Sequence, residues 1–439
     1  MSTLNVDKVD PSSGTALELG TSGDTITVPT GAGLTVVDEV KTNKVSPATG
    51  TAFALGDSGD TFTVPSGATI VNSGTATGFG ITAASFRPNV DPIVVNGDMG
   101  IAQRSTSVTG TSSGNGWTTV DRFRYWIGTA GTWTITQETL TADEAFEDGF
   151  IHAWKWDCTT ANGSLSAGSY LTTSHSLEAR NSSLFKKGTS EAEVMTLAFW
   201  VKATKTGTNT CGIYDSINNR SIRIAYTIDS TDTWEKKVMT FAGDTSGPLG
   251  TGKTKAIEIT WYWVAGTNYT SGTLQTSWAS TVTANNAVGQ VNNADSTSNN
   301  IHLTGVQLEV GSYTSSTIPP FQHESHSTSL ARCKRFYQKF PSVDNAAWFM
   351  LGYAGSTTDG YGMIWFIPEM RDTPTNNYGT TAQWDVQGQT CDYAANGSNP
   401  CSQNQLGQFN STGNLSGAHA AITVRTDTSG NNFEADAEI

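Results

Sequence analysis

The sequence predicts a mostly β protein, and three observations lead to this prediction. Glycine is abundant, with 45 residues among 439, while charged residues make up only 15 % of the chain. That composition lacks both the charge of disordered chains and the Ala, Glu, Lys and Leu content of helical bundles, and it suits short strands joined by turns. Many segments alternate polar and apolar residues with the two-residue period of a half-buried strand. The 13 tryptophans argue against disorder, because large aromatic side chains bury large areas when they order.

A duplication with an offset of 36 residues marks the N-terminal region, in the repeats 9–35 and 45–71. Both repeats contain V-x-P-x-x-G-T-A and S-G-D-T-x-T-V-P, and the alternating segments 25–28 and 61–64 are typical of strands. Repeat arrays need at least about three units to bury a continuous face, so two units on one chain are too few. Identical chains around an axis would supply the missing neighbours. We therefore expect residues 1–80 to form the β-repeat stalk of an intertwined homotrimer.

The middle of the chain, residues 88–326, reads as many short strands with almost no helix. Segments 194–201, 255–264 and 305–310 alternate most clearly. The 255–264 segment has an apolar face and an opposite polar face, formed by Ile257, Ile259, Trp261 and Trp263 on one side and by Glu258 and Thr260 on the other. This pattern predicts a central antiparallel β-sandwich of the jelly-roll type.

Several motifs in the middle and N-terminal regions resemble those of known families. The motifs of the middle region are Asn96-Gly97-Asp98-Met99, Ala102-Gln103-Arg104, Asp121-Arg122-Phe123, Thr196–Lys202 and Val306–Gly311. In this order they resemble a carbohydrate-binding-module-like domain that is common in bacteriophage tail fibres, except that Phe123 stands where Trp is more usual. The N-terminal repeat unit is similar to the N-terminal region of fibre-like structural proteins of marine bacteriophages. The resemblance implies a β-sandwich, whereas a fold likeness alone does not establish sugar binding.

The C-terminal quarter is predicted to form a helical connector, residues 327–340, and a smaller β-sandwich head, residues 341–439. The segment from Ser329 to Tyr337 is the best short helix candidate, because its apolar residues fall roughly on one face. Met363 to Pro368 is interpreted as a buried strand. The connector and the segment that follows this strand resemble the corresponding parts of phage fibres, through Cys333, Arg335, Phe336 and Tyr337 and through Met370 to Pro374.

One motif suggests nucleotide binding, and its context argues against that function. Residues 247–254 match the phosphate-binding pattern G-x-x-x-x-G-K-T. That chemistry requires a helix after the loop, whose N-terminal amides hold the phosphates. The alternating strand at 255–264 follows instead. We interpret the segment as a surface turn and predict no nucleotide cofactor.

Metal binding and disulfide bonding have only weak candidates. His323 and His326 could meet their symmetry mates on a trimer axis, although two histidines in a polar linker are more often solvated. The acidic segment 143–148 lacks the spaced ligands of a known calcium loop. We therefore predict no metal site. Cys391 and Cys401 could close a loop, and synthesis in a reducing compartment argues against it.

Charge and hydropathy exclude two classes of partner. A formal charge of −14 disfavours nucleic-acid binding, because phosphate backbones would be repelled. No stretch approaches the about 20 apolar residues that span a bilayer, so no membrane insertion is expected. The N-terminus shows no signal-peptide pattern, which favours assembly in the host cytoplasm and release as part of a virion.

These expectations favour a trimeric phage tail fibre that mediates adsorption to the host cell, and not an enzyme. The N-terminal region would contact tail or adaptor proteins, and the head would contact a host glycan or protein. Tyr378, Trp384 and Tyr393 are the receptor-binding candidates, since they lie in or beside Asn/Gly-rich segments and flat aromatic rings stack on sugars. Trp384 could alternatively face inward on a strand. The other functions to weigh are a capsid-attached or adaptor fibre and a polysaccharide-degrading tailspike, whose usual long parallel β-helix is not apparent here.

The two-repeat stalk predicts that three chains assemble into one parallel homotrimer. Ile26, Val28, Phe62 and Val64 need neighbours that one chain cannot supply. Native mass spectrometry or light scattering should give the mass of a trimer. A well-folded monomer at micromolar concentration would contradict the prediction.

Overall fold

The computed structural model describes most of the chain beyond the predicted stalk, namely residues 91–340, 348–354, 359–377, 383–386, 389–392, 405–406, 409–410, 421–426 and 433–439. The N-terminal repeats 9–35 and 45–71 lie outside the described residues. Among the helices of the described ranges, none has the length and apolar character that a bilayer crossing requires.

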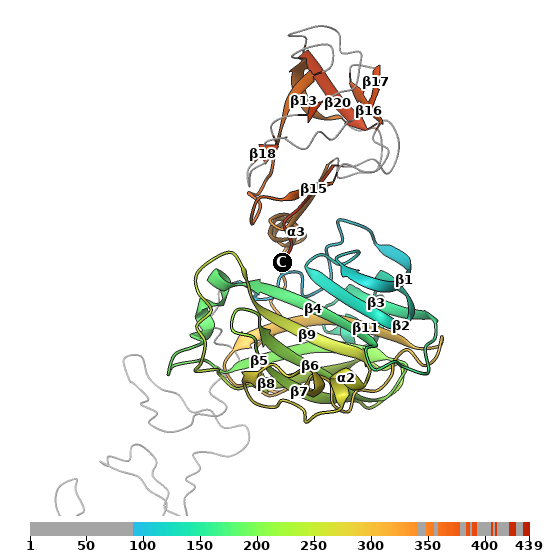
Figure 1. Ribbon diagram of the computed structural model, residues 1–439, viewed down its shortest axis with the longest axis vertical. Helices are drawn as coiled ribbons and strands as arrows, with labels where there is room; N and C mark the ends of the chain where they lie inside the picture. The colour runs from blue at the N-terminus through green and yellow to red at the C-terminus, as the bar shows by residue number, and fades with distance from the viewer. Residues whose placement is uncertain are drawn as a thin grey trace, which may run out of the picture. The chain divides into compact units, whose positions relative to one another are not determined.

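The middle region is a large antiparallel sheet that folds over itself into a sandwich (Figure 1). Its strand order is β10-β7-β6-β9-β4-β2-β3-β11-β5-β8, with β1 paired to β2. The strands are β1 Ser107–Gly116, β2 Phe123–Thr139, β3 His152–Thr160, β4 Tyr170–Glu178, β5 Met195–Ala203, β6 Gly207–Asp215, β7 Arg220–Ile228, β8 Glu235–Phe241, β9 Lys255–Ala265, β10 Ala279–Ser280 and β11 Asn300–Val310.

A bend in β2 lets this one strand serve both layers. Its first part, Phe123–Gly128, pairs with β4, and its second part, Thr132–Thr139, pairs with β3. Between them Thr129 and Gly131 have positive φ angles of 48° and 80°. A Cβ on Gly131 would lie 2.5 Å from the carbonyl oxygen of Thr160, so glycine is required at this corner.

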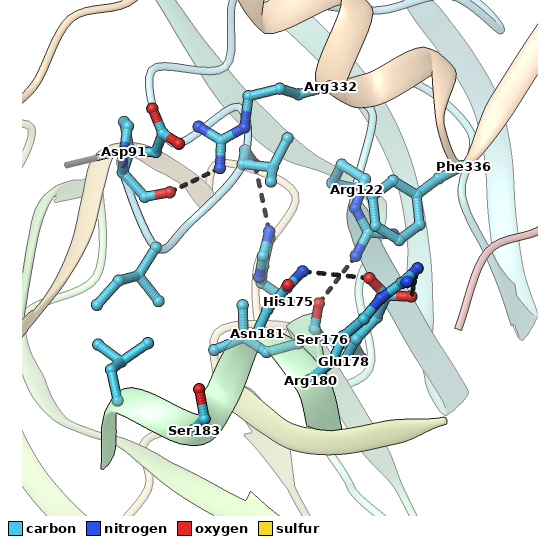
Figure 2. A pocket seen from close by; sticks show the side chains of 15 residues that line it. Asp91, Arg122, His175, Ser176, Glu178, Arg180, Asn181, Ser183, Arg332 and Phe336 are labelled. Atoms are coloured by element: carbon cyan, nitrogen blue, oxygen red, sulfur yellow. Dashed lines mark hydrogen bonds and ion pairs between the residues drawn. The ribbon is translucent and has the colours of Figure 1, made fainter. Parts of the chain in front are cut away.

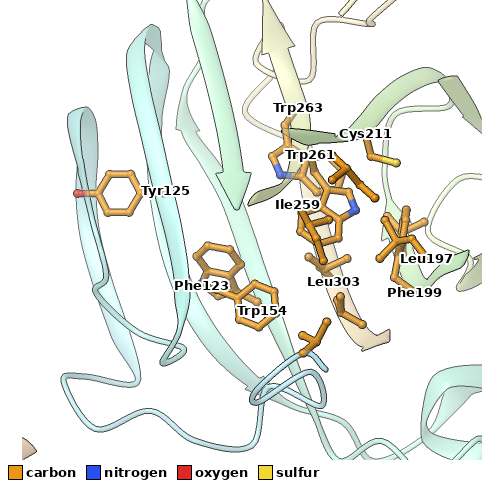
Figure 3. Packing of buried hydrophobic residues seen from close by; sticks show 14 of the residues in the cluster. Phe123, Tyr125, Trp154, Leu197, Phe199, Cys211, Ile259, Trp261, Trp263 and Leu303 are labelled. Atoms are coloured by element: carbon orange, nitrogen blue, oxygen red, sulfur yellow. The ribbon is translucent and has the colours of Figure 1, made fainter. Parts of the chain in front are cut away.

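The space between the layers is filled by aromatic and branched side chains (Figure 3). Phe199 of β5 packs edge-on against Trp261 of β9 and Tyr226 of β7, with ring centroids 5.6 and 5.3 Å apart. Because β5 is far from β9 and β7 in the strand order, these contacts are made across the core and not along the sheet. Trp154 and Trp156 of β3 extend the aromatic packing, and both are almost fully buried.

The strands predicted in this region are confirmed. The segments 194–201, 255–264 and 305–310 correspond to β5, β9 and β11. The predicted apolar face of β9 lies in the core with Ile257, Ile259, Trp261 and Trp263. In the same way Val306, Leu308 and Val310 of β11 face the core.

The helices are short and lie at the margins of the sandwich. They are α1 Asp143–Glu147, α2 Thr267–Thr270 and α3 His326–Lys334, with the 3₁₀ segments η2 Ala179–Phe185 and η3 Thr283–Asn285. The connector helix begins three residues before the predicted segment, because the Ser325 hydroxyl caps it by accepting a hydrogen bond from the Thr328 amide. It ends at Lys334, so the prediction of helix as far as Tyr337 was wrong. Tyr337 instead begins strand β12.

The C-terminal region is also β-structured, in sheets ordered β12-β21-β15 and β17-β16-β20-β13-β14-β18, with β19 paired to β14. The strands are β12 Tyr337–Phe340, β13 Trp348–Ala354, β14 Asp359–Trp365, β15 Thr375–Asn377, β16 Gln383–Val386, β17 Gln389–Asp392, β18 Gln405–Leu406, β19 Phe409–Asn410, β20 Ala421–Thr426 and β21 Phe433–Asp436.

The prediction of a buried strand from Met363 to Pro368 requires correction. The strand β14 ends at Trp365, and the segment alternates. Ile364 and Phe366 are buried, whereas Trp365 and Ile367 are 59 % and 74 % exposed. A continuous apolar run does not reveal which of its residues face solvent, and this run has one buried and one open side.

The motif Asn96-Gly97-Asp98-Met99 closes one end of the sandwich. The Asn96 side chain donates to the carbonyl oxygens of Ile101 and Asp121 and accepts from the Ile101 amide. Gly97 lies against β11, where a Cβ would meet the Val306 carbonyl oxygen at 2.1 Å. These contacts explain why the chain uses Asn and Gly here.

The motifs at 102–104 and 121–123 contact the connector and the C-terminal end of the chain. The guanidinium of Arg104 lies 3.7 Å from the Tyr337 ring centroid, and that of Arg122 lies 3.4 Å from the Phe336 ring centroid. Arg122 also pairs with Glu438, and both side chains are buried. Such contacts combine charge with aromatic packing and gain strength where water is excluded. The residues that carry the fibre resemblance therefore hold the connector on the sandwich.

Asp121 in this network generates a prediction about pH. Burial raises the pKa of its carboxyl to about 6, although Arg104 and hydrogen bonds from Gln103 act in the opposite direction. The folded protein therefore binds this proton more tightly than the unfolded chain, in which the pKa is about 3.9. The ionised carboxyl disfavours folding above about pH 6, and this unfavourable contribution disappears as the pH falls toward 4.

We expect wild type to gain about 1 kcal/mol more stability than Asp121→Asn between pH 7 and pH 5. Thermal or urea unfolding at pH 7, 6 and 5 measures the difference. The comparison with the variant removes the contributions of other titrating groups. Parallel pH curves for the two proteins would contradict a raised pKa.

Candidate functional site

The candidate site lies on the outer face of the layer that contains β2, β4, β9, β6 and β7. Side chains on this face alternate with the core residues of the same strands. Cross-strand pairing aligns Trp126 with Thr172 and Thr172 with Tyr262. We call these three residues the aromatic row.

A second row runs parallel to the first, at a distance of two residues on each of these antiparallel strands, and continues onto β6 and β7. It aligns Arg124 with Ser174, Ser174 with Thr260, Thr260 with Gly212, and Gly212 with Arg223. The centre of this arginine row thus consists of small residues. A Cβ on Gly212 would lie 2.4 Å from Cδ of Arg223, which shows that the Arg223 side chain lies over the glycine.

Thr260 and Arg223 of this row line a hollow of about 340 Å³, which we call the groove. Aromatic, hydroxyl and charged side chains line it, namely Trp126, Tyr170, Thr172, Tyr214, Arg223, Lys255, Glu258, Thr260, Tyr262, Tyr269, Thr281 and Asn286. Five of these residues are aromatic, and they come from four strands and from α2. The groove therefore offers flat apolar surfaces beside hydrogen-bonding groups.

The aromatic wall of the groove is a packed cluster. Tyr269 of α2 lies 5.7 Å from Tyr170 and 6.1 Å from Tyr262, measured between ring centroids. Burial raises the pKa of both Tyr262 and Tyr269. Their phenols therefore stay protonated at neutral pH and can donate hydrogen bonds.

The charged groups of the groove differ in their partners. Lys255 Nζ lies 2.5 Å from Oε2 of Glu258, so these two charges compensate each other. Arg223 donates from Nε to Asn286 at 3.3 Å. Arg124 lies on the arginine row outside the lining of the groove, 4.0 Å from the Trp126 ring centroid, and donates to the side-chain oxygen of Asn115. The two arginines thus contact a neutral amide and an aromatic ring.

A second hollow, of about 430 Å³, lies between residues 91–95 and α3 (Figure 2). Its polar groups pair with one another and join parts of the chain. The Glu178 carboxylate is fully buried there and accepts hydrogen bonds from Arg335 at 2.6 and 3.0 Å. Figure 2 also shows Arg122 donating to the carbonyl oxygen of Ser176. Burial holds the pKa of His175 well below its usual value, so this imidazole is neutral at pH 7. The polar groups here hold the connector against the sandwich.

The prediction of the receptor residues Tyr378, Trp384 and Tyr393 stays a prediction. Tyr378 and Tyr393 lie outside the described residues, and Trp384 lies on strand β16. The possible disulfide between Cys391 and Cys401 is likewise untested, since Cys401 lies outside the described residues.

The weaker sequence candidates have structural explanations. The His323 ring packs against Phe150 and Phe321, with centroids 5.3 and 4.8 Å away. The acidic segment forms α1, and its Asp148 accepts a hydrogen bond from Trp200. Within the part of the chain that the structure describes, no group of three or more His, Cys, Asp or Glu side chains could hold a metal ion.

The loop that matches the phosphate-binding pattern is held by a lysine side chain of the sandwich. The ammonium group of Lys187 donates to the carbonyl oxygens of Ser246 and Gly247, each at 2.9 Å. Strand β9 begins directly after the loop, at Lys255, as the sequence predicted. A phosphate loop would instead present amide groups at the start of a helix.

The groove itself was not found by sequence reasoning, although part of its signal was present. The predicted polar face of 255–264 contains Glu258 and Thr260, which line the groove. The groove also needs β2, β4, β6 and β7 in register with β9. That register depends on long-range pairing, which a single alternating segment does not specify.

Comparisons with known proteins give fold neighbours only. No protein-family model and no curated protein matches the chain. Among solved structures, the enzymatically active domain of a tailspike protein from bacteriophage CBA120 shows 13 % identity and a TM-score of 0.25 over 50 % of this chain and 21 % of that chain. The alignment thus spans about a fifth of the tailspike domain.

Two further neighbours are sugar-related by description. A protein from Bacteroides thetaiotaomicron described as sugar binding shows 12 % identity and a TM-score of 0.26 over 50 % of this chain and 100 % of that chain. A family 11 carbohydrate-binding module from Clostridium thermocellum, in complex with a mixed-linked tetrasaccharide, shows 10 % identity and a TM-score of 0.23 over 48 % and 100 %. At these identities the similarity concerns the fold alone, and at these TM-scores nothing about function follows from it.

Proposed function

We propose that this protein is a glycan-binding structural protein of a bacteriophage virion, a trimeric tail fibre, and that its sandwich binds the glycan in the groove. The observation that carries the proposal is the groove on an open sheet face, where aromatic rings stand beside hydroxyl, amide and charged groups. Sugar rings offer apolar C–H faces that stack on aromatic planes, while their hydroxyls need fixed hydrogen-bond partners.

The position of the groove favours a chain-like ligand. Its floor is a sheet held by a packed aromatic core, so the binding groups are preorganised and little entropy is lost on binding. The aromatic row and the arginine row run across the strands, which lie about 4.8 Å apart. Five strands thus present groups over roughly 19 Å, a length that suits several linked sugar rings and exceeds one.

The phage assignment is supported by the sequence resemblance. The motifs around Asn96, Gln103 and Asp121 resemble the fibre-associated sandwich domain, and the N-terminal repeats are similar to those of marine phage fibres. On this proposal the N-terminal region attaches three chains to the tail or an adaptor. The sandwich then adsorbs the virion to a surface glycan, and the C-terminal region extends from the connector.

The groove supports binding and not hydrolysis. Glycoside hydrolases generally use two carboxyl groups that flank the scissile bond. Among the residues lining the groove, Glu258 is the one carboxylate, and it is paired with Lys255. We therefore propose that the protein is not an enzyme.

The proposal predicts that Trp126→Ala weakens glycan binding roughly tenfold, as expected for the loss of a stacking aromatic ring. The purified full chain is applied to an array of neutral and acidic oligosaccharides, and affinities for the bound glycans are measured by calorimetry. Because Trp126 is only half-buried, its removal should leave the melting temperature nearly unchanged.

Trp365→Ala is the matched control, since it removes the same side chain at an exposed position of the C-terminal region. Tyr378→Ala and Tyr393→Ala test the alternative in which the head recognises the receptor. Normal glycan binding by Trp126→Ala, together with a loss of binding in either tyrosine variant, would overturn the proposal that the groove binds the glycan. It would favour recognition by the C-terminal head.

A further inference from the structure

The arginine row contains the feature on which this inference depends. Three of its polar atoms are buried and lack a hydrogen-bond partner among the described residues, namely Nε of Arg124, Oγ of Ser174 and Nη1 of Arg223. Ser174 and Arg223 are only 1 % and 3 % exposed. Buried donors without an acceptor cost free energy, which a bound acceptor would recover.

The arginines of this row also differ in their charge partners from most others. Six described arginines pair with a carboxylate, namely Arg104, Arg122, Arg180, Arg220, Arg332 and Arg335. Arg124 and Arg223 form no ion pair with a carboxylate within the described ranges. In a chain with a net charge of −14, acidic partners are plentiful, yet neither of these arginines forms an ion pair, although the charge of Glu258 acts on Arg124 from a distance.

The local charge of the groove is positive. Among its lining residues, Arg223 and Lys255 contribute two positive charges and Glu258 contributes one negative charge, and Arg124 adds a positive charge at the end of the arginine row. The net negative charge of the whole chain acts weakly here, because salt screens exposed charges beyond about 8 Å at physiological ionic strength. Nearby charges therefore decide which ligand is attracted.

We propose that the groove selects an acidic glycan, one carboxylate or sulfate group of which lies in the groove and accepts from Arg223, while a further acidic group of the same glycan chain lies beside Arg124 at the other end of the arginine row. The planar guanidinium presents paired donors that match such oxyanions. Thr260 places a hydroxyl group in the groove between the two arginines, and Gly212 leaves room for the Arg223 side chain. The inference rests on the proposed glycan function and names its ligand class.

The test uses the full chain and hexasaccharides of known charge. Oligogalacturonate and oligoalginate supply carboxylates, a carrageenan oligosaccharide supplies sulfates, and carboxyl-reduced oligogalacturonate and cellohexaose are neutral. We expect an acidic probe to bind at least about tenfold more tightly than the neutral probes. Its affinity should fall between 50 and 500 mM NaCl, because the contact is electrostatic.

Variants connect this preference to the row. Arg223→Gln should reduce binding of the acidic probe about tenfold or more and leave binding of neutral probes nearly unchanged. Arg124→Gln, at a half-buried position, repeats the test if the buried substitution disturbs folding. Lys186→Gln removes the same charge at an exposed site and should have no effect.

The possible outcomes separate the two proposals. An acidic preference that depends on the arginines supports the inference, and the carboxylate and sulfate probes show which anion is preferred. Neutral binding that depends on Trp126, without any preference for acidic probes, overturns the inference and leaves the glycan function intact. If no probe of either class binds at millimolar concentration, the glycan function falls as well.

Discussion

The two-residue period of the strands connects the groove of this protein to its core. In β9 the residues Ile257, Ile259 and Trp261 fill the space between the layers, and Glu258 and Thr260, which lie between them, face the groove. Moving β9 by one residue would exchange the two sets, which would place a carboxylate in the core. The packing of Phe199 on Trp261 therefore fixes the register of the binding face as well as the stability of the sandwich. The proposed binding surface, held in this way, would need little rearrangement on contact with a ligand.

Arginine has two different roles in the molecule, and its partners distinguish them. At the junction with the connector, Arg122 lies on Phe336 and pairs with the buried Glu438, so its positive charge is compensated within the chain. On the arginine row, Arg223 is equally buried, and among the described residues its guanidinium contacts the neutral amide of Asn286 and the ring of Tyr262. Burying a charge is unfavourable unless it is paired. In the first environment, Glu438 of the same chain pairs with Arg122. The second environment supplies no carboxylate in an ion pair with Arg223 among the described residues, and this is the physical basis for the proposed ligand class of the groove.

The motifs that resemble phage fibres have mainly a structural role in this chain. Asn96 and Gly97 close an end of the sandwich, and Gln103, Arg104 and Asp121 hold the connector and the C-terminal end. A likeness carried by these residues therefore reports how the domains are joined. It carries no information about the groove, which lies on β2, β4, β9, β6 and β7. This separation explains why a fold can be recognised while its ligand is not, since the site is built on surfaces that the fold leaves free to vary.

The sequence by itself determined the β character of the chain, the strand at 255–264 with its two faces, and the start of the C-terminal region at a short helix. These features follow from local periodicity and turn composition, which act over a few residues. The tertiary structure alone decided that Arg124, Ser174, Thr260, Gly212 and Arg223 form one row, because they come from five strands separated by up to about 140 positions in the chain. It also decided that Trp365 is exposed and Phe366 buried, which the apolar run around them did not reveal. Long-range strand pairing sets both, and its register depends on packing across the whole core and not on any single segment.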